Sequence, residues 1–233
     1  MRSYKIAGVT VNMDTFGFAY DRGRPYEIEY TAEPDITIES HWEDLKKAHP
    51  EVHEFFCEYT STGSDFYEKL LAFDGMLLHS SAVVMDGKAY LFSADSGTGK
   101  STHTSLYRRY YGDDRVRILN DDKPAIRLED GIFYAYGTPW SGKTDLNLNL
   151  RVPLAGVCLL ERGEKNEIAP LPAGKALFRL LQQTRRFDDK VKMDKVMMLL
   201  DALLRKVPVW IMKCNMDPEA ARVSYEAMSG KNN

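Results

Sequence analysis

The sequence has little cysteine, no long hydrophobic run and almost no excess of charge. Its three cysteines (Cys57, Cys158 and Cys214) are odd in number, widely spaced and set among apolar residues, which indicates reduced core thiols and argues against a disulfide framework. No apolar run approaches the ~18 residues that a membrane span needs, and the N-terminus lacks the apolar stretch of a signal peptide. These absences predict a cytoplasmic protein with no membrane partner.

The charges nearly balance, with a formal net charge of −3 and a pI of about 6.0. The sequence contains no strongly basic patch, so it gives no reason to expect nucleic acid as a partner. Apolar residues make up 44% of the chain, which is ample for a core. The 233 residues fit one large domain, or one domain with a small appendage.

Hydrophobic periodicity predicts an α/β protein with a mixed sheet, a β-rich start and a helical end. Strands are expected near residues 6–11, 26–30, 36–39, 82–85, 88–92, 116–119, 125–128, 132–136, 154–160 and 207–212. Helices are expected over residues 41–48, 51–71 with an interruption near Gly63, 102–111 and most of the C-terminal third. The dipeptide Asp86-Gly87 predicts a hairpin. We expect an N-terminal region, 1–75, packed on a main domain, 76–233, or a single domain overall.

Two segments compete for the role of a phosphate-binding loop. The phosphate-loop pattern is glycine, four residues, and then Gly-Lys-Ser/Thr. Residues 137–144, Gly-Thr-Pro-Trp-Ser-Gly-Lys-Thr, match this pattern in full. Residues 94–101, Ala-Asp-Ser-Gly-Thr-Gly-Lys-Ser, have Ala94 in place of the first glycine. The pattern alone therefore favours the later segment.

The context of the two segments favours the earlier one. Segment 94–101 follows an apolar strand and opens a helical stretch, so its glycines let successive N–H groups surround phosphate oxygens at a helix N-terminus. In segment 137–144, Pro139 removes one donor, and residues 145–150 alternate like a strand. We therefore predict that segment 94–101 binds the phosphates, and that residues 137–144 do not.

Within that loop, Lys100 is expected to reach the β- and γ-phosphates, and the Ser101 hydroxyl a Mg²⁺ ion. The predicted nucleotide contacts are Ser96, Gly97, Thr98, Gly99, Lys100, Ser101 and Thr102. The alternative is a glycine-rich turn with a surface lysine. Phosphate loops recognise phosphates and not the base, so ATP and GTP fit equally well.

Two adjacent carboxylates, Asp121 and Asp122, follow the predicted strand 116–119. Phosphoryl transfer needs a carboxylate for the metal, and often a second one to accept the proton of the acceptor hydroxyl. Adjacent acids at a strand end can supply both, although neighbours on an extended chain point to opposite sides. The alternative is an ordinary acidic turn before Lys123-Pro124.

The order of Leu78-His79, a β hairpin, the loop 94–101 and Leu119-Asn120-Asp121-Asp122 resembles the HPr kinase/phosphorylase-like kinases. This family is related in fold to phosphoenolpyruvate carboxykinase. The resemblance covers residues 77–128 well, and residues 137–142 look like a loop of shorter, divergent relatives. It implies a P-loop fold of this type, ATP or GTP with Mg²⁺ as cofactors, and a homo-oligomer.

The resemblance also implies roles for single residues. Asp121 would be the general base, Asp122 and Ser101 would hold Mg²⁺, and His79 would lie close to the carboxylates and tune them. An arginine beyond the sheet contacts phosphate in that family. Arg185 and Arg186, on a predicted helical run over 182–186, are the candidates here; the alternative is a solvated helix face.

Three functions remain open at this point. The first is an ATP-dependent kinase that phosphorylates a hydroxyl group, either a serine of a peptide or protein or a small molecule. The second is a non-catalytic nucleotide-binding or regulatory module that assists a partner enzyme in a peptide-modification pathway, as Ala94 and the missing Arg-Gly segment of the family suggest. The third is a carboxykinase-like reaction on a small acid.

Overall fold

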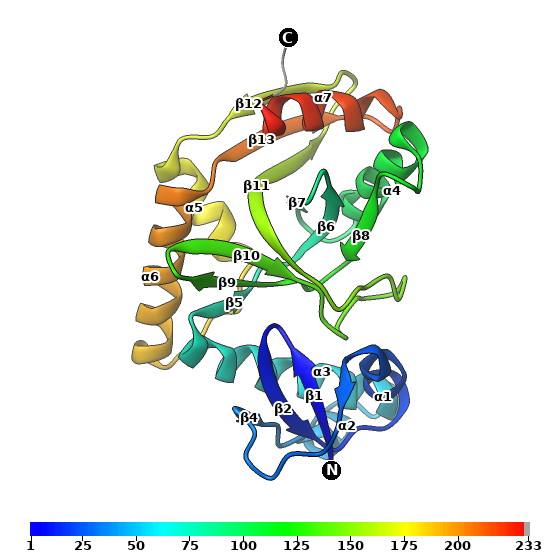
Figure 1. Cartoon of the computed structure of the whole chain (residues 1–233), viewed down its shortest axis with the longest axis vertical. Coiled ribbons are helices and arrows are strands. Elements are labelled where there is room, and N and C mark those ends of the chain that lie inside the picture. The colour runs from blue at the N-terminus through cyan, green and yellow to red at the C-terminus, as the bar shows by residue number, and fades with distance from the viewer. Residues whose placement is uncertain (231–233) are drawn as a thin grey trace.

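The computed structural model describes residues 1–230, and the chain opens with a four-stranded sheet of order β3-β1-β2-β4. The strands are β1 (Arg2–Ile6), β2 (Val9–Met13), β3 (Glu27–Ile28) and β4 (Ile36–Thr37). The single strand predicted over 6–11 is wrong, because Ala7 and Gly8 take positive φ and turn the chain into an antiparallel hairpin. This sheet lies at the bottom of the molecule in Figure 1.

Helices accompany the N-terminal sheet: α1 (Gly17–Gly23), η1 (Arg24–Tyr26), α2 (Trp42–Ala48), α3 (Glu54–Lys69) and η2 (Leu70–Phe73). The predicted interruption near Gly63 is wrong, since α3 runs through it. A Cβ at Gly63 would stand 2.7 Å from Cδ1 of Trp140. The glycine therefore serves close packing of that indole and not a break in the helix.

The main sheet has nine strands and mixes parallel with antiparallel pairs, which confirms the predicted α/β class. They are β5 (Gly75–Leu77), β6 (Ser80–Met85), β7 (Lys88–Ser93), β8 (Arg117–Asn120), β9 (Ala125–Glu129), β10 (Ile132–Tyr136), β11 (Arg151–Arg162), β12 (Glu167–Pro170) and β13 (Val209–Cys214). The path runs β5-β9-β10-β11-β7-β6-β8, with β13 beside β11 and β12 beside β13. The expected hairpin at Asp86-Gly87 joins β6 to β7.

The long strand β11 makes the sheet curl. Its first residues pair antiparallel with β10, whereas its later residues lie parallel between β7 and β13. Figure 1 shows this strand bending from the β9–β10 hairpin towards the upper part of the molecule. Residues 145–150, which precede it and alternate like a strand, form only an isolated bridge between Asn120 and Asn147.

Four helices cover the two faces of the curled sheet: α4 (Lys100–Tyr111), α5 (Ala173–Gln182), α6 (Lys190–Lys206) and α7 (Glu219–Ser229). Side chains alternate along a strand. Leu91 and Leu159 therefore pack with α5 and α6, whereas their neighbours Phe92 and Leu160 pack with α4 and α7. In residues 1–230 no helix is long and apolar enough to cross a membrane, and the three cysteines are free.

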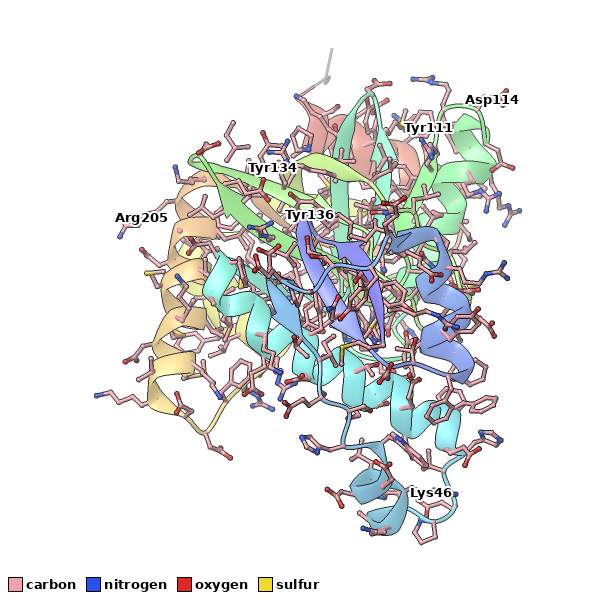
Figure 2. All side chains as sticks on the ribbon, turned by 60° about the horizontal axis from the view of Figure 1, so that its bottom comes forward. Lys46, Tyr111, Asp114, Tyr134, Tyr136 and Arg205 are labelled. Atoms are coloured by element: carbon pink, nitrogen blue, oxygen red, sulfur yellow. The ribbon has the colours of Figure 1, made fainter. Side chains whose placement is uncertain are left out.

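A third apolar cluster joins the N-terminal sheet to the main sheet. Tyr4 and Ile6 of β1 meet Phe66 of α3, Trp140 and Tyr136 in it. Figure 2 shows Tyr136 beside the β1–β2 hairpin. The N-terminal residues thus pack against the part of the main sheet that precedes residues 137–144, and the division of the chain at residue 75 stays a prediction.

Candidate functional site

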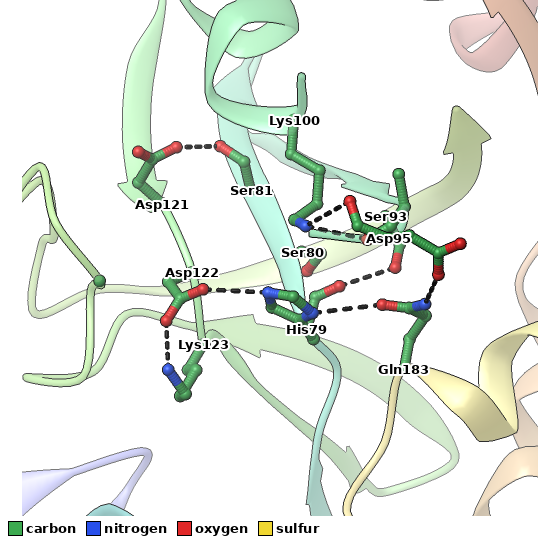
Figure 3. Close-up of polar contacts among 12 residues, drawn as sticks. His79, Ser80, Ser81, Ser93, Asp95, Lys100, Asp121, Asp122, Lys123 and Gln183 are labelled. Carbon is green, nitrogen blue, oxygen red and sulfur yellow. Dashed lines mark hydrogen bonds and ion pairs between the residues drawn. The ribbon is translucent and has the colours of Figure 1, made fainter. Parts of the chain in front are cut away.

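Strand pairing brings three predicted segments to one edge of the sheet. Because β6 is antiparallel to both β7 and β8, the start of β6 lies beside the ends of the other two strands. Ser80 pairs with Ser93, and Ala82 pairs with Asn120. His79, the loop after β7 and the carboxylates after β8 therefore meet at this edge, as Figure 3 shows.

The chain passes from β7 through residues 94–99 directly into α4, the strand–loop–helix order that the sequence predicts. Gly97 and Gly99 have φ of 78° and 120°, a region in which only glycine is free of strain. A Cβ at Gly97 would meet nothing within 4 Å. The glycines are thus required by the backbone course of the loop, not by crowding around it.

Lys100 begins α4 and points back into the loop. Its side chain is buried, and Nζ donates to the carbonyl oxygens of Ala94 at 2.9 Å and Asp95 at 3.5 Å. Burial lowers the pKa of Lys100, while the charges of Asp122, Asp95 and Asp121 oppose that shift. The ammonium group is therefore anchored inside the loop and shares its surroundings with the three carboxylates.

The remaining predicted contact residues lie along the same loop and the first turn of the helix. Ser96, Ser101 and Thr102 are exposed, and Thr98 is half-buried. The carbonyl oxygen of Gly97 accepts a hydrogen bond from Arg162 at 2.7 Å, which ties the loop to the end of β11. These hydroxyl and backbone groups are available to an anion, and their role as nucleotide contacts stays a prediction.

A hydrogen-bonded chain links two carboxylates across the site. Asp122 Oδ1 lies 3.1 Å from His79 Nε2, and His79 Nδ1 lies 3.2 Å from Gln183 Oε1. The Gln183 amide donates to Asp95 Oδ1 at 3.1 Å. Because that carboxylate can only accept, the amide oxygen faces the imidazole, and both ring nitrogens then face acceptors. His79 therefore bridges Asp122 and the Gln183 amide oxygen through its two ring nitrogens.

Asp122 stays ionised in this arrangement. Burial by itself would raise the pKa of its carboxyl, but the hydrogen bond from His79 and the charge of Lys123 outweigh burial and hold that pKa at about 2. Lys123 forms an ion pair with Oδ2 of Asp122. The carboxylate is thus anionic at every ordinary pH.

Asp121 is buried, and hydroxyl groups contact both of its oxygens. Ser81 donates to Oδ1 at 2.6 Å, and Thr144 donates to Oδ2 at 2.7 Å. Ser81 also lies 2.7 Å from the hydroxyl of Thr104 on α4. The carboxylate thus accepts hydroxyl hydrogens on two sides, which is the contact that a general base makes with a nucleophile.

Residues 137–144 border these carboxylates and do not join a strand to a helix. Asn120 Nδ2 donates to the carbonyl of Thr138 at 2.9 Å, while Asn120 Oδ1 accepts the N–H groups of Asp122 and Lys123. A Cβ at Gly142 would stand 2.7 Å from Cβ of Asp122. The segment that matches the phosphate-loop pattern in full therefore packs against the acidic turn.

The two candidate arginines lie outside a helix, so the predicted helical run over 182–186 is wrong. Helix α5 ends at Gln182, and α6 begins only at Lys190. Arg185 donates to the carbonyl of Ser64 and lies 2.9 Å from Glu68, both on α3. Arg186 is exposed. Phosphate contact by either arginine stays a prediction.

Several residues of the site carry no signal in the sequence. Gln183 lies just after α5, and only the fold places it between His79 and Asp95. Ser81 and Thr144 reach Asp121 from a strand and a loop far apart in the chain. The alternation of side chains along β6 predicts that Ser81 lies on the face opposite Ser80. It does not predict that Ser81 contacts the carboxylate of Asp121.

Two cavities flank the loop. The first, of about 310 Å³, has polar walls that include Asp95, Arg179 and Gln183. The second, of about 510 Å³, lies between the start of α4 and the ends of β11 and β13, with Thr102, Leu160 and Met216 among its walls. Both cavities include Thr98 and Arg162, so the loop separates a polar hollow from a more apolar one.

A solved structure, the Hpr(Ser) kinase/phosphatase from Coxiella burnetii, is similar with a TM-score of 0.40 and 11% identity, over 67% of this chain and 99% of that chain. This is a weak fold-level similarity, with which the mixed, curled sheet is compatible. A comparison with curated proteins gave no match.

A family model, described as SynChlorMet cassette protein ScmC, matches residues 45–219. The match begins in α2 and ends at the start of α7, so it takes in the whole main sheet and every residue of the candidate site. The chain therefore belongs to the ScmC family.

Proposed function

We propose that this protein binds a nucleoside triphosphate with Mg²⁺ at the loop 94–101 and transfers the γ-phosphate to a hydroxyl group. One observation carries the proposal: the ammonium group of Lys100 and the carboxylates of Asp121 and Asp122 share the sheet edge at which the loop enters α4. Phosphoryl transfer requires positioning and electrostatic stabilisation above all. Lys100 inside the glycine loop, opposite the ionised Asp122 and the proposed base Asp121, would supply both the positioning and the electrostatic stabilisation.

The loop suits a polyphosphate. Its backbone turns at two glycines with positive φ, and the N-terminus of a twelve-residue helix, α4, follows at once. Such a helix end carries a partial positive charge and unsatisfied N–H groups. Lys100 would exchange its contact with the carbonyl of Ala94 for the β- and γ-phosphates.

The residues present fit Mg²⁺. In residues 1–230 no group of three or more His, Cys, Asp or Glu side chains could hold a metal without other ligands. Mg²⁺ commonly takes one or two protein oxygens and completes its shell with water and substrate phosphates. Asp122, ionised with a pKa of about 2, and the exposed Ser101 hydroxyl are donors of this kind. Bound there, the ion would neutralise charge on the phosphates.

The second cavity gives the nucleoside a place. It lies beside Thr102 and His103 at the start of α4 and shares Gly97, Thr98 and Gly99 with the loop. Its apolar walls, Leu160 and the exposed Met216, suit the face of a base. With the base on that side, the γ-phosphate would point to Asp121 and Asp122.

Asp121 is proposed as the general base. It would take the proton of the acceptor hydroxyl, in the way that it now accepts the hydroxyl hydrogens of Ser81 and Thr144. His79 would hold Asp122 in place through the contact between its Nε2 and Asp122 Oδ1. Arg185 and Arg186 remain candidate phosphate contacts. The acceptor is a hydroxyl of a peptide, a protein or a small molecule.

Titration calorimetry with ATP and GTP, with and without Mg²⁺, followed by γ-labelled nucleotide and a panel of hydroxyl acceptors, tests the proposal. We expect Mg²⁺-dependent binding, and a transfer rate that Asp121→Asn lowers by about 100-fold or more while binding is kept. Full transfer activity in Asp121→Asn would show that the base is assigned wrongly. Absence of nucleotide binding would refute the proposal as a whole.

A second candidate function is a nucleotide-binding module without catalysis. It is favoured by the protein groups already on the carboxylates: Lys123 and His79 on Asp122, and Ser81 and Thr144 on Asp121. In such a module the acids would be structural. Stoichiometric nucleotide binding, with no phosphate transferred to any acceptor or to water, would favour this candidate.

A further inference from the structure

One hydroxyl group of the protein already occupies the place of a phosphoryl acceptor. The Thr144 side chain donates its hydroxyl hydrogen to Asp121 Oδ2 at 2.7 Å. A nucleophile and its base are expected to lie about 2.6–3.2 Å apart. The other hydroxyl on this carboxylate, Ser81, is fully buried inside the sheet, whereas Thr144 is exposed. Thr144 therefore combines contact with the base and access from the solvent side of the site.

A tight turn fixes this hydroxyl. Gly142 and Asp145, on either side of Lys143-Thr144, have φ of 74° and 55°. Arg22 holds both ends of the turn: it donates to the carbonyl of Gly142 at 2.6 Å and lies 3.1 Å from Asp145. Tyr59 accepts the N–H of Gly142 at 2.9 Å.

The carboxylate is tied to the same turn. The N–H of Asp121 donates to the carbonyl of Leu146, two residues beyond Thr144, at 3.1 Å. Base and hydroxyl therefore lie on two segments that a backbone hydrogen bond joins close to their contact.

We propose that Thr144 is a phosphoryl acceptor within its own chain, so that the protein phosphorylates itself at this residue. The inference rests on the proposed function. Thr144 Oγ1 forms a bond to the γ-phosphorus, and the bond from that phosphorus to the β,γ-bridging oxygen breaks. The hydroxyl proton passes to Asp121, and the nucleoside diphosphate leaves with the electron pair of the broken bond. Atoms and charge balance with the nucleotide as the only co-reactant.

Transfer occurs in cis because Thr144 contacts the base of its own chain. The product is a phosphothreonine whose charge lies next to Asp121 and Asp145. Like charges at this distance repel each other. We expect phosphorylation to release the hydroxyl position from the base, so that the site then stands open to an external acceptor.

The test incubates the full chain with γ-labelled ATP and Mg²⁺ and locates the phosphate by tandem mass spectrometry. We expect one phosphate per chain on Thr144, at a first-order rate that does not change with protein concentration. Thr144→Ser keeps the label and Thr144→Val loses it. Ser105→Ala is the matched control, because Ser105 is an exposed hydroxyl on α4 that donates to the carbonyl of Thr102; it keeps the label.

Mixing experiments separate transfer within one chain from transfer between chains. In one mixture, the wild-type protein is incubated with a Lys100→Ala chain and labelled ATP. Label on Thr144 of the Lys100→Ala chain would mean that the wild-type protein transferred it, which would overturn transfer in cis. A chain that binds MgATP and passes phosphate to water or to an added hydroxyl, while its own Thr144 stays unmodified, overturns the inference and leaves the proposed function standing. A chain that binds no nucleotide overturns both.

Discussion

The loops 94–101 and 137–144 share the ending Gly-Lys-Ser/Thr, yet their settings in the fold differ. The first joins β7 to α4 and places Lys100 inside its own turn. The second follows β10, leads into no strand or helix, and lies against Asp122 through Gly142. The first loop is held by Lys100 within its own turn and by Arg162 of the main sheet, whereas residues of the N-terminal region hold the second.

The difference shows that a short motif acquires its meaning from the elements on either side. A phosphate cradle needs a strand to fix its entrance and a helix N-terminus to supply its charge. Segment 137–144 has the residues without that frame, and Pro139 removes one of its donors. Gly142 allows close packing on Asp122, and Thr144 contacts Asp121.

Removing the lysine of each loop in turn is the most direct test of the difference between the two loops. Lys100→Ala loses charge-assisted contacts with the phosphates, each worth about 1.5–3 kcal/mol, so nucleotide affinity should fall by roughly 100-fold or more. Lys143→Ala, which removes an exposed lysine of the second loop, should leave affinity nearly unchanged. Titration calorimetry with MgATP distinguishes the two variants, and an equal loss in both would mean that the loops are assigned wrongly.

Asp122 lies between the two loops and is the next test. Because its pKa is about 2, the wild-type carboxylate is charged throughout the range of ordinary assays. Asp122→Asn should weaken the Mg²⁺-dependent part of nucleotide binding by about 10- to 100-fold and leave metal-free binding nearly intact. Binding measured with and without Mg²⁺ decides this, and an equal loss in both conditions would assign Asp122 to packing alone.

The packing role of the second loop is tested at Gly142. Gly142→Ala places a Cβ 2.7 Å from Asp122 at a positive φ, whereas Gly87→Ala meets the same kind of backbone strain with nothing within 4 Å. The free energy of unfolding should fall by about 1–3 kcal/mol more for Gly142→Ala than for the control. Denaturant unfolding measures the free energy of unfolding of both variants. Equal losses would mean that the loop accommodates the added Cβ without loss of stability.

The smallest effect concerns Glu58, which links α3 to α1 and so connects Tyr59 with Arg22, the two residues that hold the second loop. Burial raises the pKa of Glu58 to about 7 against hydrogen bonds from the backbone of Phe16 and Ala19. A raised carboxyl pKa favours the neutral form in the folded state, so the stability that this group contributes is lost as the pH rises from about 4.5 through 7.

Glu58→Gln should therefore be less sensitive to pH than the wild type. We expect it to match the wild type near pH 5 and to be more stable by about 1–2 kcal/mol near pH 8. Glu54→Gln, an exposed residue of the same helix, is the control and should keep the wild-type dependence. Thermal unfolding at the two pH values measures this, and identical wild-type and Glu58→Gln profiles would contradict the raised pKa.

Much of the fold could be predicted because its signals are local. The hairpin at Asp86-Gly87, the strand before the first loop and the helix after it follow from periodicity and turn residues within short windows. The sequence also places His79 before a strand and the loop and Asp121-Asp122 after strands, and the pairing of β6 with β7 and β8 brings those strand ends together.

The rest of the site depends on contacts that no local pattern encodes. Gln183 meets His79 across 104 positions of the chain, and Arg22 meets Gly142 across 120. Gly63 looked like a helix breaker because the indole that it accommodates, Trp140, lies on another segment. Residues 145–150 alternate like a strand but meet the end of β8 only at the isolated bridge between Asn147 and Asn120, so tertiary context overrode their alternation.

The hydrogen bonds that Arg22 and Tyr59 form with Gly142 also bear on the order in which the site folds. Contacts that span 120 and 83 positions close large loops of chain, which is slow compared with the formation of a hairpin or helix. During synthesis the β6–β7 hairpin and the loop that follows it can form while the turn at 142–145 is still inside the ribosome. The loop after β7 can therefore form early, whereas the contacts that Arg22 and Tyr59 make with residue 142 form late.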